Sequence, residues 1–184
     1  MLRLQGGEDL ALNELMAKWQ KPLVHFVYRY IGNETDALDL AQETFVRVFE
    51  SRHRYKAKAK FSTWLFTIAS NLSRNYIRWQ HRHPTVAFES SDSANPSSGI
   101  ESFESGDQSP AESAEAQDSA AAVKREVQKL PHDLRTAVLL FEYEDMSHEE
   151  ISRVLGCSAK AVETRLYRAR KLLREALAGM NFAR

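Results

Sequence analysis

The sequence predicts an all-α protein in which a flexible acidic linker joins two small helical domains. Apolar residues recur every three or four positions through residues 9–82 and 121–177, which is the period of amphipathic helices. No stretch of alternating apolar and polar residues competes with that pattern. Residues 86–120 contain ten serines, eight acidic residues and no basic residue. We therefore expect domains at residues 1–85 and 121–184, with the linker at 86–120.

Four helices are expected in the first domain. Asp9 can cap the first helix. Pro22 suits the opening turn of a second helix, because proline lacks the backbone N–H that a helix interior needs. Gly32 is suited to end that helix in a left-handed turn. Asn33 or Thr35 can then cap a third helix, and a basic loop leads to the fourth.

The fourth helix, residues 61–82, carries two stripes of different chemistry. At about 100° per residue, one stripe is apolar and forms the expected core face: Phe61, Leu65, Ile68, Leu72, Tyr76 and Trp79. The other is polar and then basic: Thr63, Thr67, Asn71, Arg74, Arg78 and Arg82. From Ser51 to His83 there are eight Lys or Arg and no Asp or Glu. Because a solvated face normally mixes both signs, this surface favours a polyanionic partner.

The distribution of charge supports the division into domains. The whole chain has a formal net charge of zero, but residues 1–85 carry +5, residues 86–120 carry −8 and residues 121–184 carry +3. The serine-rich acidic segment cannot bury enough apolar area to offset the entropy of ordering it. A flexible polar tether between two basic domains is typical of proteins that bind nucleic acid.

A helix-turn-helix is expected in the second domain. A helix to about Leu130, the break at Pro131 and a helix over residues 135–143 precede it. Ser147 and Glu150 then form the S-x-x-E capping-box pattern, Gly156 can adopt a left-handed turn, and Ser158 can cap a longer basic helix. A plain helical hairpin would show the same capping, but the tight glycine turn and the excess of basic residues favour DNA binding.

Two sets of outward positions follow from the period of the longer helix. Lys160, Glu163, Thr164 and Tyr167 would face base edges in a major groove. Arg165, Arg168 and Lys171 are better placed for phosphates. The expected inner face is Val162, Leu166, Ala169, Leu172 and Leu173.

An acidic face is expected on the third helix. Asp39, Gln42 and Glu43 lie away from a core stripe of Leu38, Ala41, Phe45, Val48 and Phe49. Solvated acids without a partner are the simplest interpretation. An acidic patch on a nucleic-acid binder is nevertheless misplaced for DNA and well placed for a basic protein partner.

On these residues the chain resembles a bacterial sigma factor of the sigma-70 family, in the extracytoplasmic-function (ECF, group 4) class. DALDLAQETFVRVF is similar to the core-binding helix, and KFSTWLFTIASNLSRNYIRWQHR to the promoter-melting region. LPHDLRTAVLLFEYEDMSHEEISRVLGCSAKAVETRLYRARKLLREAL is similar to the helix-turn-helix domain. The resemblance implies that the first domain is sigma region 2 and the second is sigma region 4. It also implies transcription initiation at the promoters of a signal- or stress-responsive regulon.

The resemblance implies three sets of site residues. Leu38, Asp39, Gln42 and Glu43 match the motif that binds the clamp helices of the largest subunit of core RNA polymerase. The set implied for the melted −10 strand, including a loop that captures a flipped-out base, is Arg54, Lys56, Lys58, Lys60, Phe61, Thr67, Asn71, Arg74, Asn75, Arg78 and Arg82. The set implied for the −35 duplex is Ser158, Lys160, Glu163, Thr164, Arg165, Tyr167, Arg168 and Lys171.

Two of these positions depart from the family pattern. Many relatives have Asp where this chain has Asn75. Many have a basic or small residue where this chain has Glu163, a residue that can accept a hydrogen bond from a cytosine amino group. The resemblance further implies the polymerase β flap and an anti-sigma factor as partners.

The remaining observations argue against other classes of protein. The sequence contains no nucleophile elbow, P-loop or zinc-ligand spacing, and no Cys or carboxylate lies close to His81 and His83. We expect no enzyme activity, metal or cofactor. A single cysteine, Cys157, and the lack of a long apolar run favour a cytoplasmic protein without membrane insertion, associated with the nucleoid when bound to polymerase. The alternative is a helix-turn-helix repressor or activator that binds duplex DNA without polymerase.

Overall fold

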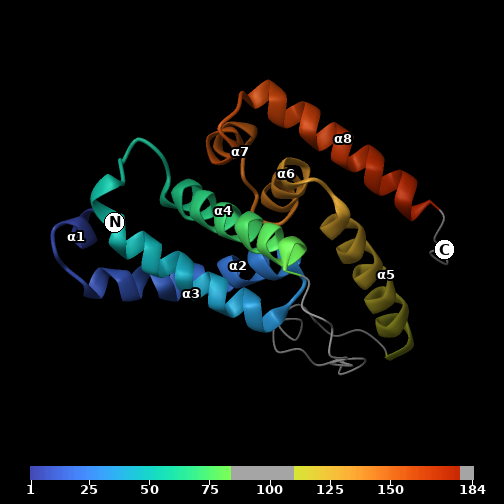
Figure 1. Ribbon diagram of the computed structural model, residues 1–184, viewed down its shortest axis with the longest axis horizontal. Coiled ribbons are helices and arrows are strands. Elements are labelled where there is room, and N and C mark those ends of the chain that lie inside the picture. Colours follow the sequence, from blue (N-terminus) through green and yellow to red (C-terminus); the bar gives the residue numbers. More distant parts are fainter. Residues whose placement is uncertain (84–109, 179–184) are drawn as a thin grey trace.

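The computed structural model describes residues 1–83 and 110–178, with side chains placed for 1–83 and 119–178. Within those residues every regular element is a helix (Figure 1). The first half comprises α1 (Leu2–Gln5), α2 (Leu10–Ile31), α3 (Glu34–Glu50), the 3-10 turn η1 (Arg52–Arg54) and α4 (Phe61–Arg82). The second half comprises α5 (Pro110–Lys129), α6 (His132–Glu142), α7 (His148–Leu155) and α8 (Ala159–Leu177).

The expected helical architecture is confirmed, with differences at the boundaries. Helix α5 begins at Pro110, inside the segment that the sequence predicts as linker, and α6 begins at His132 rather than at Arg135. Residues 84–109 of the predicted linker lie outside the described residues.

The two halves pack against each other, which the sequence did not predict. Helix α2 contacts α5 and α6, and α4 contacts α7. Buried side chains of both halves form one continuous hydrophobic cluster, from Leu23 and Phe26 in α2 to Leu139 and Ile151 in the second half. Figure 1 shows α3 and α8 on opposite sides of this arrangement, so both helices present a face to solvent.

Helix α2 replaces two predicted helices. The sequence predicted that Pro22 would open a new helix, but Pro22 lies inside one continuous helix of 22 residues. Proline removes one backbone hydrogen bond from a helix interior. The helix continues because Leu23, Phe26 and Tyr30 after the proline are buried in the same core as the residues before it. Gly32 ends the helix at φ 86° as predicted, and Asp9 precedes it without a capping side-chain bond.

The core face of α4 is rotated relative to the prediction. Its buried residues are Thr63, Leu65, Phe66, Ala69, Ser70 and Ser73. Trp79, predicted to be core, is 52% exposed, and Thr63, predicted to face outward, is buried. The difference arises because α4 is covered by the second half as well as by α2 and α3. Tyr76 lies at the edge of the core, where its hydroxyl donates to the Asp36 carboxylate at 2.5 Å.

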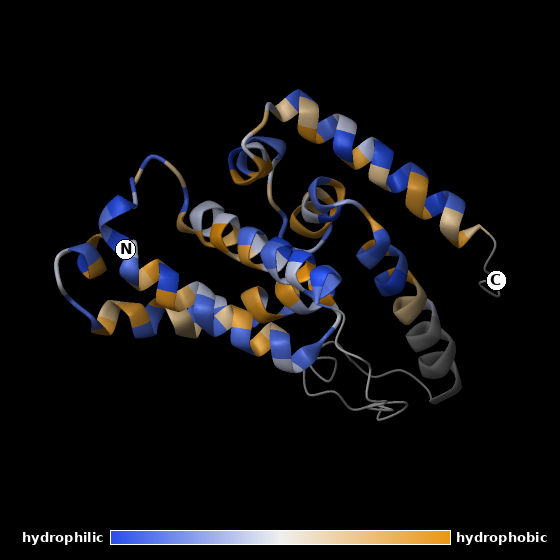
Figure 2. Ribbon diagram, viewed as in Figure 1, coloured by the Kyte–Doolittle hydropathy of each residue, from blue (hydrophilic) through white to orange (hydrophobic). Residues whose placement is uncertain are grey.

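The capping predictions for the other helices are confirmed. Asn33 caps α3 by accepting from the backbone N–H of Asp36 at 3.0 Å. In α8, Val162, Leu166 and Ala169 are buried as predicted. Leu172 is 44% exposed, whereas the adjacent Leu173 is partly buried and packs against the core. Figure 2 shows the alternation of hydrophilic and hydrophobic residues along α3, α4 and α8 that characterises half-buried helices.

Candidate nucleic-acid interface

A basic face runs along the outside of α4. Its residues Asn71, Arg74, Asn75, Arg78 and Arg82 are all exposed. Thr67 is half-buried, and its hydroxyl donates to the Thr63 carbonyl at 2.7 Å. We call these six residues the α4 basic face. Apart from Thr67, they present amide and guanidinium groups to solvent, and the helix itself contains no Asp or Glu.

The loop before α4 continues this basic face. Arg54, Lys56, Lys58 and Lys60 are exposed. Phe61 is half-buried, because it packs edge-to-face on Trp19 and Trp64 with ring centroids 6.1 Å and 6.3 Å apart. The structure therefore presents the charged groups of the loop to solvent and holds its aromatic end in place.

Internal contacts give this loop a defined shape. The Tyr55 hydroxyl donates to the Ala59 carbonyl at 3.0 Å, and the Tyr55 ring packs on Trp64 at 5.2 Å. The Gln5 side-chain amide donates to the carbonyls of Arg52 and Tyr55 at 2.7 Å and 2.9 Å. Sequence reasoning missed Gln5, because a polar residue near the N-terminus carries no signal that it reaches a loop about fifty positions away.

An acidic and apolar patch occupies the outer face of α3. Leu38, Asp39 and Gln42 are exposed, and Glu43 is half-buried. Val46 extends the patch at 49% exposure, and Leu38 is 40% exposed although the sequence placed it in the core stripe. Glu43 forms an ion pair with Arg47 at 2.8 Å, one turn further along the same helix. The patch thus combines exposed carboxylates with two exposed aliphatic side chains, which suits a protein partner.

The helix-turn-helix is built as predicted. The Ser147 hydroxyl accepts from the backbone N–H of Glu150, and the Glu150 carboxylate accepts from the backbone N–H of Ser147. Gly156 ends α7 at φ 62°, a left-handed conformation that glycine adopts without steric cost. Ser158 then caps α8 by accepting from the backbone N–H of Ala161 at 3.1 Å. These three devices fix the angle at which α8 leaves the turn.

Most of the predicted base-facing and phosphate-facing residues of α8 are exposed: Ser158, Lys160, Glu163, Thr164, Tyr167, Arg168 and Lys171. Tyr167 is 70% exposed. Glu163 forms an ion pair with Lys160 at 2.7 Å, and the hydrogen bond from Lys160 lowers the pKa of the Glu163 carboxyl. Glu163 is therefore an anion in the N-terminal half of α8, where the other charged residues are basic.

Arg165 differs from the other predicted phosphate contacts. Its guanidinium donates to the Cys157 Sγ and to the Asp133 carboxylate, both at 2.7 Å, and its side chain is only 23% exposed. It thereby ties α8 to the turn before it and to the first turn of α6. The helical period placed Arg165 on the polar side, but could not show that Asp133 lies opposite.

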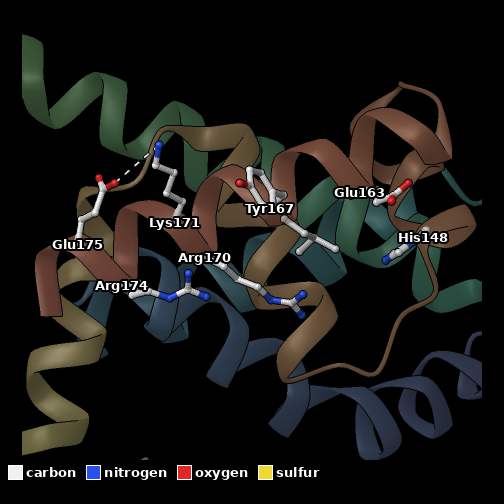
Figure 3. Close-up of a pocket in the computed structure, with 8 residues that line it drawn as sticks. His148, Glu163, Tyr167, Arg170, Lys171, Arg174 and Glu175 are labelled. Atoms are coloured by element: carbon white, nitrogen blue, oxygen red, sulfur yellow. Dashed lines mark ion pairs between the residues drawn. The ribbon is translucent and has the colours of Figure 1, made fainter. Parts of the chain in front are cut away.

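A shallow groove of about 550 Å³ follows α8 on the side of α7 (Figure 3). Tyr167, Arg170, Lys171 and Arg174 line it from α8, and His148 lines it from the first turn of α7. Figure 3 shows their polar ends distributed along the same stretch of helix. Glu163 and Glu175 line the groove as well, so its charged groups are of both signs, with three basic side chains against two acidic ones.

Charged and titratable groups lie where the two halves meet. Lys60 of the basic loop forms an ion pair with Glu150 at 2.8 Å. The hydrogen bond from Lys60, with that from the Ser147 backbone, lowers the pKa of Glu150 to about 2. Burial raises the pKa of Glu144 to about 7, and the nearby Arg29 only partly opposes that effect. The two carboxyls therefore differ: ionised Glu150 pairs with Lys60, whereas burial favours the neutral form of Glu144.

His132 and Arg135 of α6 make polar contacts with α2. The Tyr30 hydroxyl lies 2.5 Å from His132 Nδ1, and the Arg135 guanidinium donates to the Tyr30 carbonyl at 2.9 Å. Burial lowers the pKa of His132, and the positive charge of Arg74 lowers it further. The neutral imidazole is thus the form that fits between the halves.

The described residues offer neither a cluster of metal ligands nor a membrane-spanning helix. In residues 1–83 and 119–178, no three His, Cys, Asp or Glu side chains gather as a potential metal site. None of the helices in the described ranges has both the length and the apolar character that crossing a membrane requires.

Comparison with known proteins identifies related sequences over nearly the whole chain. Residues 15–83 match the family Sigma-70 region 2, and residues 120–173 match Sigma-70, region 4. The RNA polymerase sigma-H factor of Pseudomonas aeruginosa is 30% identical over 175 residues, which cover 95% of this chain and 90% of that protein. The ECF RNA polymerase sigma-E factor of Escherichia coli K12 is 31% identical over 181 residues, which cover 93% of this chain and 88% of that protein.

A solved structure shares the fold. CnrH, determined in complex with the cytosolic domain of CnrY, superimposes with a TM-score of 0.72 at 25% sequence identity. The match covers 98% of this chain and 96% of that one.

Proposed function

The chain belongs to the sigma-70 family of RNA polymerase sigma factors, in its ECF class, and we propose how its surfaces divide the work of promoter recognition. The observation that carries the proposal is the separation of charge among three exposed helix faces. Acidic residues gather on α3, whereas α4 and α8 are basic. One acidic face for polymerase and two basic faces for DNA is the division that a promoter-specificity factor needs.

Core RNA polymerase binds the outer face of α3 in this proposal. Leu38, Asp39, Gln42 and Glu43 contact the clamp helices of the largest subunit. The exposed Leu38 supplies apolar contact at the centre, and the carboxylates supply complementarity to a basic surface. Glu43 exchanges its ion pair with Arg47 for one with the polymerase. The β flap is the second polymerase contact, through the α5–α8 half.

The melted −10 strand binds the α4 basic face and the loop before it. Guanidinium and ammonium groups neutralise the phosphates, while Asn71 and Asn75 can donate to and accept from base edges. The loop of residues 54–61 captures a flipped-out base. Its shape is supported by the bonds from Gln5 and by the Tyr55 ring on Trp64. A preformed loop lowers the entropy lost when a single strand is ordered.

The −35 duplex binds α8 through its major groove. Lys160, Glu163, Thr164 and Tyr167 face base edges from the N-terminal half of the helix. Arg168 and Lys171 contact phosphates, together with the Arg170 and Arg174 side chains in the groove of Figure 3. Arg165 acts indirectly, because its bonds to Cys157 and Asp133 hold α8 at a fixed angle.

Promoter binding requires the two halves to separate. Elements at −35 and −10 lie about 25 base pairs apart, roughly 85 Å at 3.4 Å per base pair. A compact chain of 184 residues has a radius of gyration of about 16 Å. The docked arrangement is too small to reach both elements, so the Lys60–Glu150 ion pair must break when both are engaged.

Beyond polymerase and DNA, the proposal includes one further protein partner and assigns no catalysis to this chain. An anti-sigma factor is a further partner, an idea supported by the family and by CnrH, which was solved with a bound protein partner. The relatives are named as sigma factors rather than as enzymes. We propose that this chain performs no catalysis, that the polymerase supplies the active-site metal, and that the protein acts in the cytoplasm and at the nucleoid.

Binding to bacterial core polymerase tests the role of α3. The affinity of Asp39→Ala/Glu43→Ala for core should fall at least tenfold, because both removed carboxylates would face a basic partner. Asp9→Ala/Glu14→Ala removes the same charge from exposed positions at the start of α2 and should bind like the unmodified chain. Equal affinities for the two double variants would contradict the role given to α3.

A further inference from the structure

A side-chain hydrogen bond joins α3 to α4, and the division of surfaces above gives it no role. The Tyr76 hydroxyl of α4 donates to the Asp36 carboxylate in the first turn of α3 at 2.5 Å. The Gln80 side-chain amide donates to the same hydroxyl at 2.7 Å, from one turn further along α4. Asp36 is itself held in place, because its backbone N–H donates to the Asn33 side chain that caps α3.

The bond lies beyond the point where the buried part of α4 ends. The first and last buried residues of α4 are Thr63 and Ser73, and none of the nine residues from Arg74 to Arg82 is buried. These residues extend for about 13 Å at 1.5 Å each. Ile77 packs partly against the core there. The hydrogen bond from Tyr76 to α3 therefore holds a part of α4 that burial alone holds weakly.

This end of α4 carries most of the α4 basic face. The members of the face that lie beyond the last buried residue are Arg74, Asn75, Arg78 and Arg82, all of them exposed. On the other side of the bond, Asp39 of the acidic patch follows Asp36 by three positions on α3. One hydrogen bond thus connects the helix assigned to polymerase with the guanidinium groups assigned to the −10 strand.

The chemistry of the bond suits a fixed geometry. A hydrogen bond to an ionised carboxylate is shorter and about twice as strong as one between neutral groups. Burial raises the pKa of the Tyr76 hydroxyl, and the bond to Asp36 raises it further, so the phenol keeps its proton and remains the donor. Because this hydroxyl donates to Asp36 and accepts from Gln80, its orientation is set from both sides.

We propose that Asp36 is a positioning residue for the −10 strand, because through Tyr76 it fixes the C-terminal end of α4 relative to the helix that polymerase binds. A strand that binds cations already held in place loses less free energy to ordering them. Without the bond this end of α4 moves against α3, and its arginines no longer keep one position relative to the polymerase. The inference rests on the proposed function and adds to it two residues outside the three site sets.

The test uses variants that change single atoms of this bond. Tyr76→Phe removes the donor and keeps the ring, Asp36→Ala removes the acceptor, and Asp36→Asn keeps an oxygen that can accept. Tyr143→Phe is the matched control, because it removes a hydroxyl from an exposed tyrosine of the second half. The double variant Tyr76→Phe/Asp36→Ala completes the set.

Three affinities are measured for each variant. The first is the affinity of the chain for core polymerase. The others are the affinities of the holoenzyme for a single-stranded −10 oligonucleotide and for a −35 duplex, both taken from a promoter that the unmodified holoenzyme selects.

The proposal predicts that Tyr76→Phe and Asp36→Ala each weaken binding of the −10 oligonucleotide about tenfold. The double variant should lose no more than either single variant, because both substitutions remove the same bond. Asp36→Asn should keep most of the affinity and Tyr143→Phe all of it. The affinities for core polymerase and for the −35 duplex should stay constant in every variant.

Unchanged binding of the −10 oligonucleotide by Tyr76→Phe would overturn the proposal, and so would losses that add in the double variant. A parallel loss of all three affinities would also overturn it, because a contact that only stabilises the fold weakens every interaction together. If the unmodified chain neither binds core nor selects a promoter, the proposed function fails. If it does both and Tyr76→Phe behaves like Tyr143→Phe, this inference alone fails.

Discussion

Arg135 offers the sharpest test of how the two halves of the chain are held together. Its side chain is 8% exposed, and its guanidinium donates to the Tyr30 carbonyl at 2.9 Å, to the Leu130 carbonyl at 3.0 Å and to the Gln128 carbonyl. These carbonyls lie near the C-terminal ends of α2 and α5, where helix carbonyls lack partners within the helix. Burial lowers the pKa of Arg135, as expected for a cation without a carboxylate partner.

The structure sets the size of the expected effect. A hydrogen bond to a charged group contributes about 1.5–3 kcal/mol, and an unsatisfied buried carbonyl costs about 1–3 kcal/mol. Replacing Arg135 by alanine removes three such bonds, but it also removes the cost of burying the charge. We therefore expect the free energy of unfolding to fall by about 3 kcal/mol. Arg135→Lys keeps the charge but lacks the planar fork, so it should lose about half as much.

Urea denaturation of the full chain measures this change, with Arg153→Ala as the control because Arg153 is exposed. Small-angle scattering measures whether the halves part, and Arg135→Ala should increase the radius of gyration. A loss below about 1 kcal/mol, with an unchanged radius, would refute the reasoning that this guanidinium joins α2 to the second half.

Three further predictions concern Glu144, Gln5 and Glu163. The pKa of the Glu144 carboxyl is about 7 in the folded chain instead of 4.5, so folding favours its neutral form. The stability that this neutral carboxyl provides is fully present below pH 4.5 and is lost as the pH rises through 7. Glu144→Gln should therefore raise the free energy of unfolding by up to about 3 kcal/mol at about pH 8.5 and change it little at about pH 4, as measured by urea titration at both values. Gln5→Glu keeps the shape but removes the N–H donors to the loop, so binding of holoenzyme to a single-stranded −10 oligonucleotide should weaken about tenfold, while −35 duplex affinity stays constant. Glu163→Ala should change the preferred base at one −35 position by roughly tenfold in a duplex selection, and an unchanged preference would remove Glu163 from the reading set.

Local signals predicted the second half of the molecule well. The Ser147–Glu150 capping box, the left-handed Gly156 and the Ser158 cap all occur as expected, because each depends on residues within a few positions of one another. The cap on α3 at Asn33 belongs to the same class. Such features are encoded locally and need no knowledge of the rest of the fold.

Two wrong predictions concern contacts between residues distant in sequence. Pro22 suggested a helix start, but packing on both sides of it preserved one long helix. Trp79 lay on the apolar stripe of α4, but the second half moved the buried face away from it. The period of α8 likewise could not show that Arg165 forms an ion pair with Asp133. Helical periodicity shows which residues share a face and leaves open what covers that face.

The candidate site was predictable to the extent that it depends on charge. The α4 basic face and the outer residues of α8 were identified from their spacing, and nearly all are exposed. Gln5 was not identified from the sequence, because its hydrogen bonds to the carbonyls of Arg52 and Tyr55 leave no trace in composition. The docking of the two halves was also missed, because it depends on a shared hydrophobic cluster and on ion pairs such as Lys60–Glu150 between residues far apart in sequence.

Run-off transcription tests the central claim most directly. Bacterial core polymerase is incubated with a pool of genomic promoter fragments, with and without the purified chain. The account predicts transcripts that appear only when the chain is present and that disappear with Asp39→Ala/Glu43→Ala. The absence of such transcripts, together with tight binding of the isolated chain to duplex DNA, would contradict it and support a helix-turn-helix repressor or activator that works without polymerase.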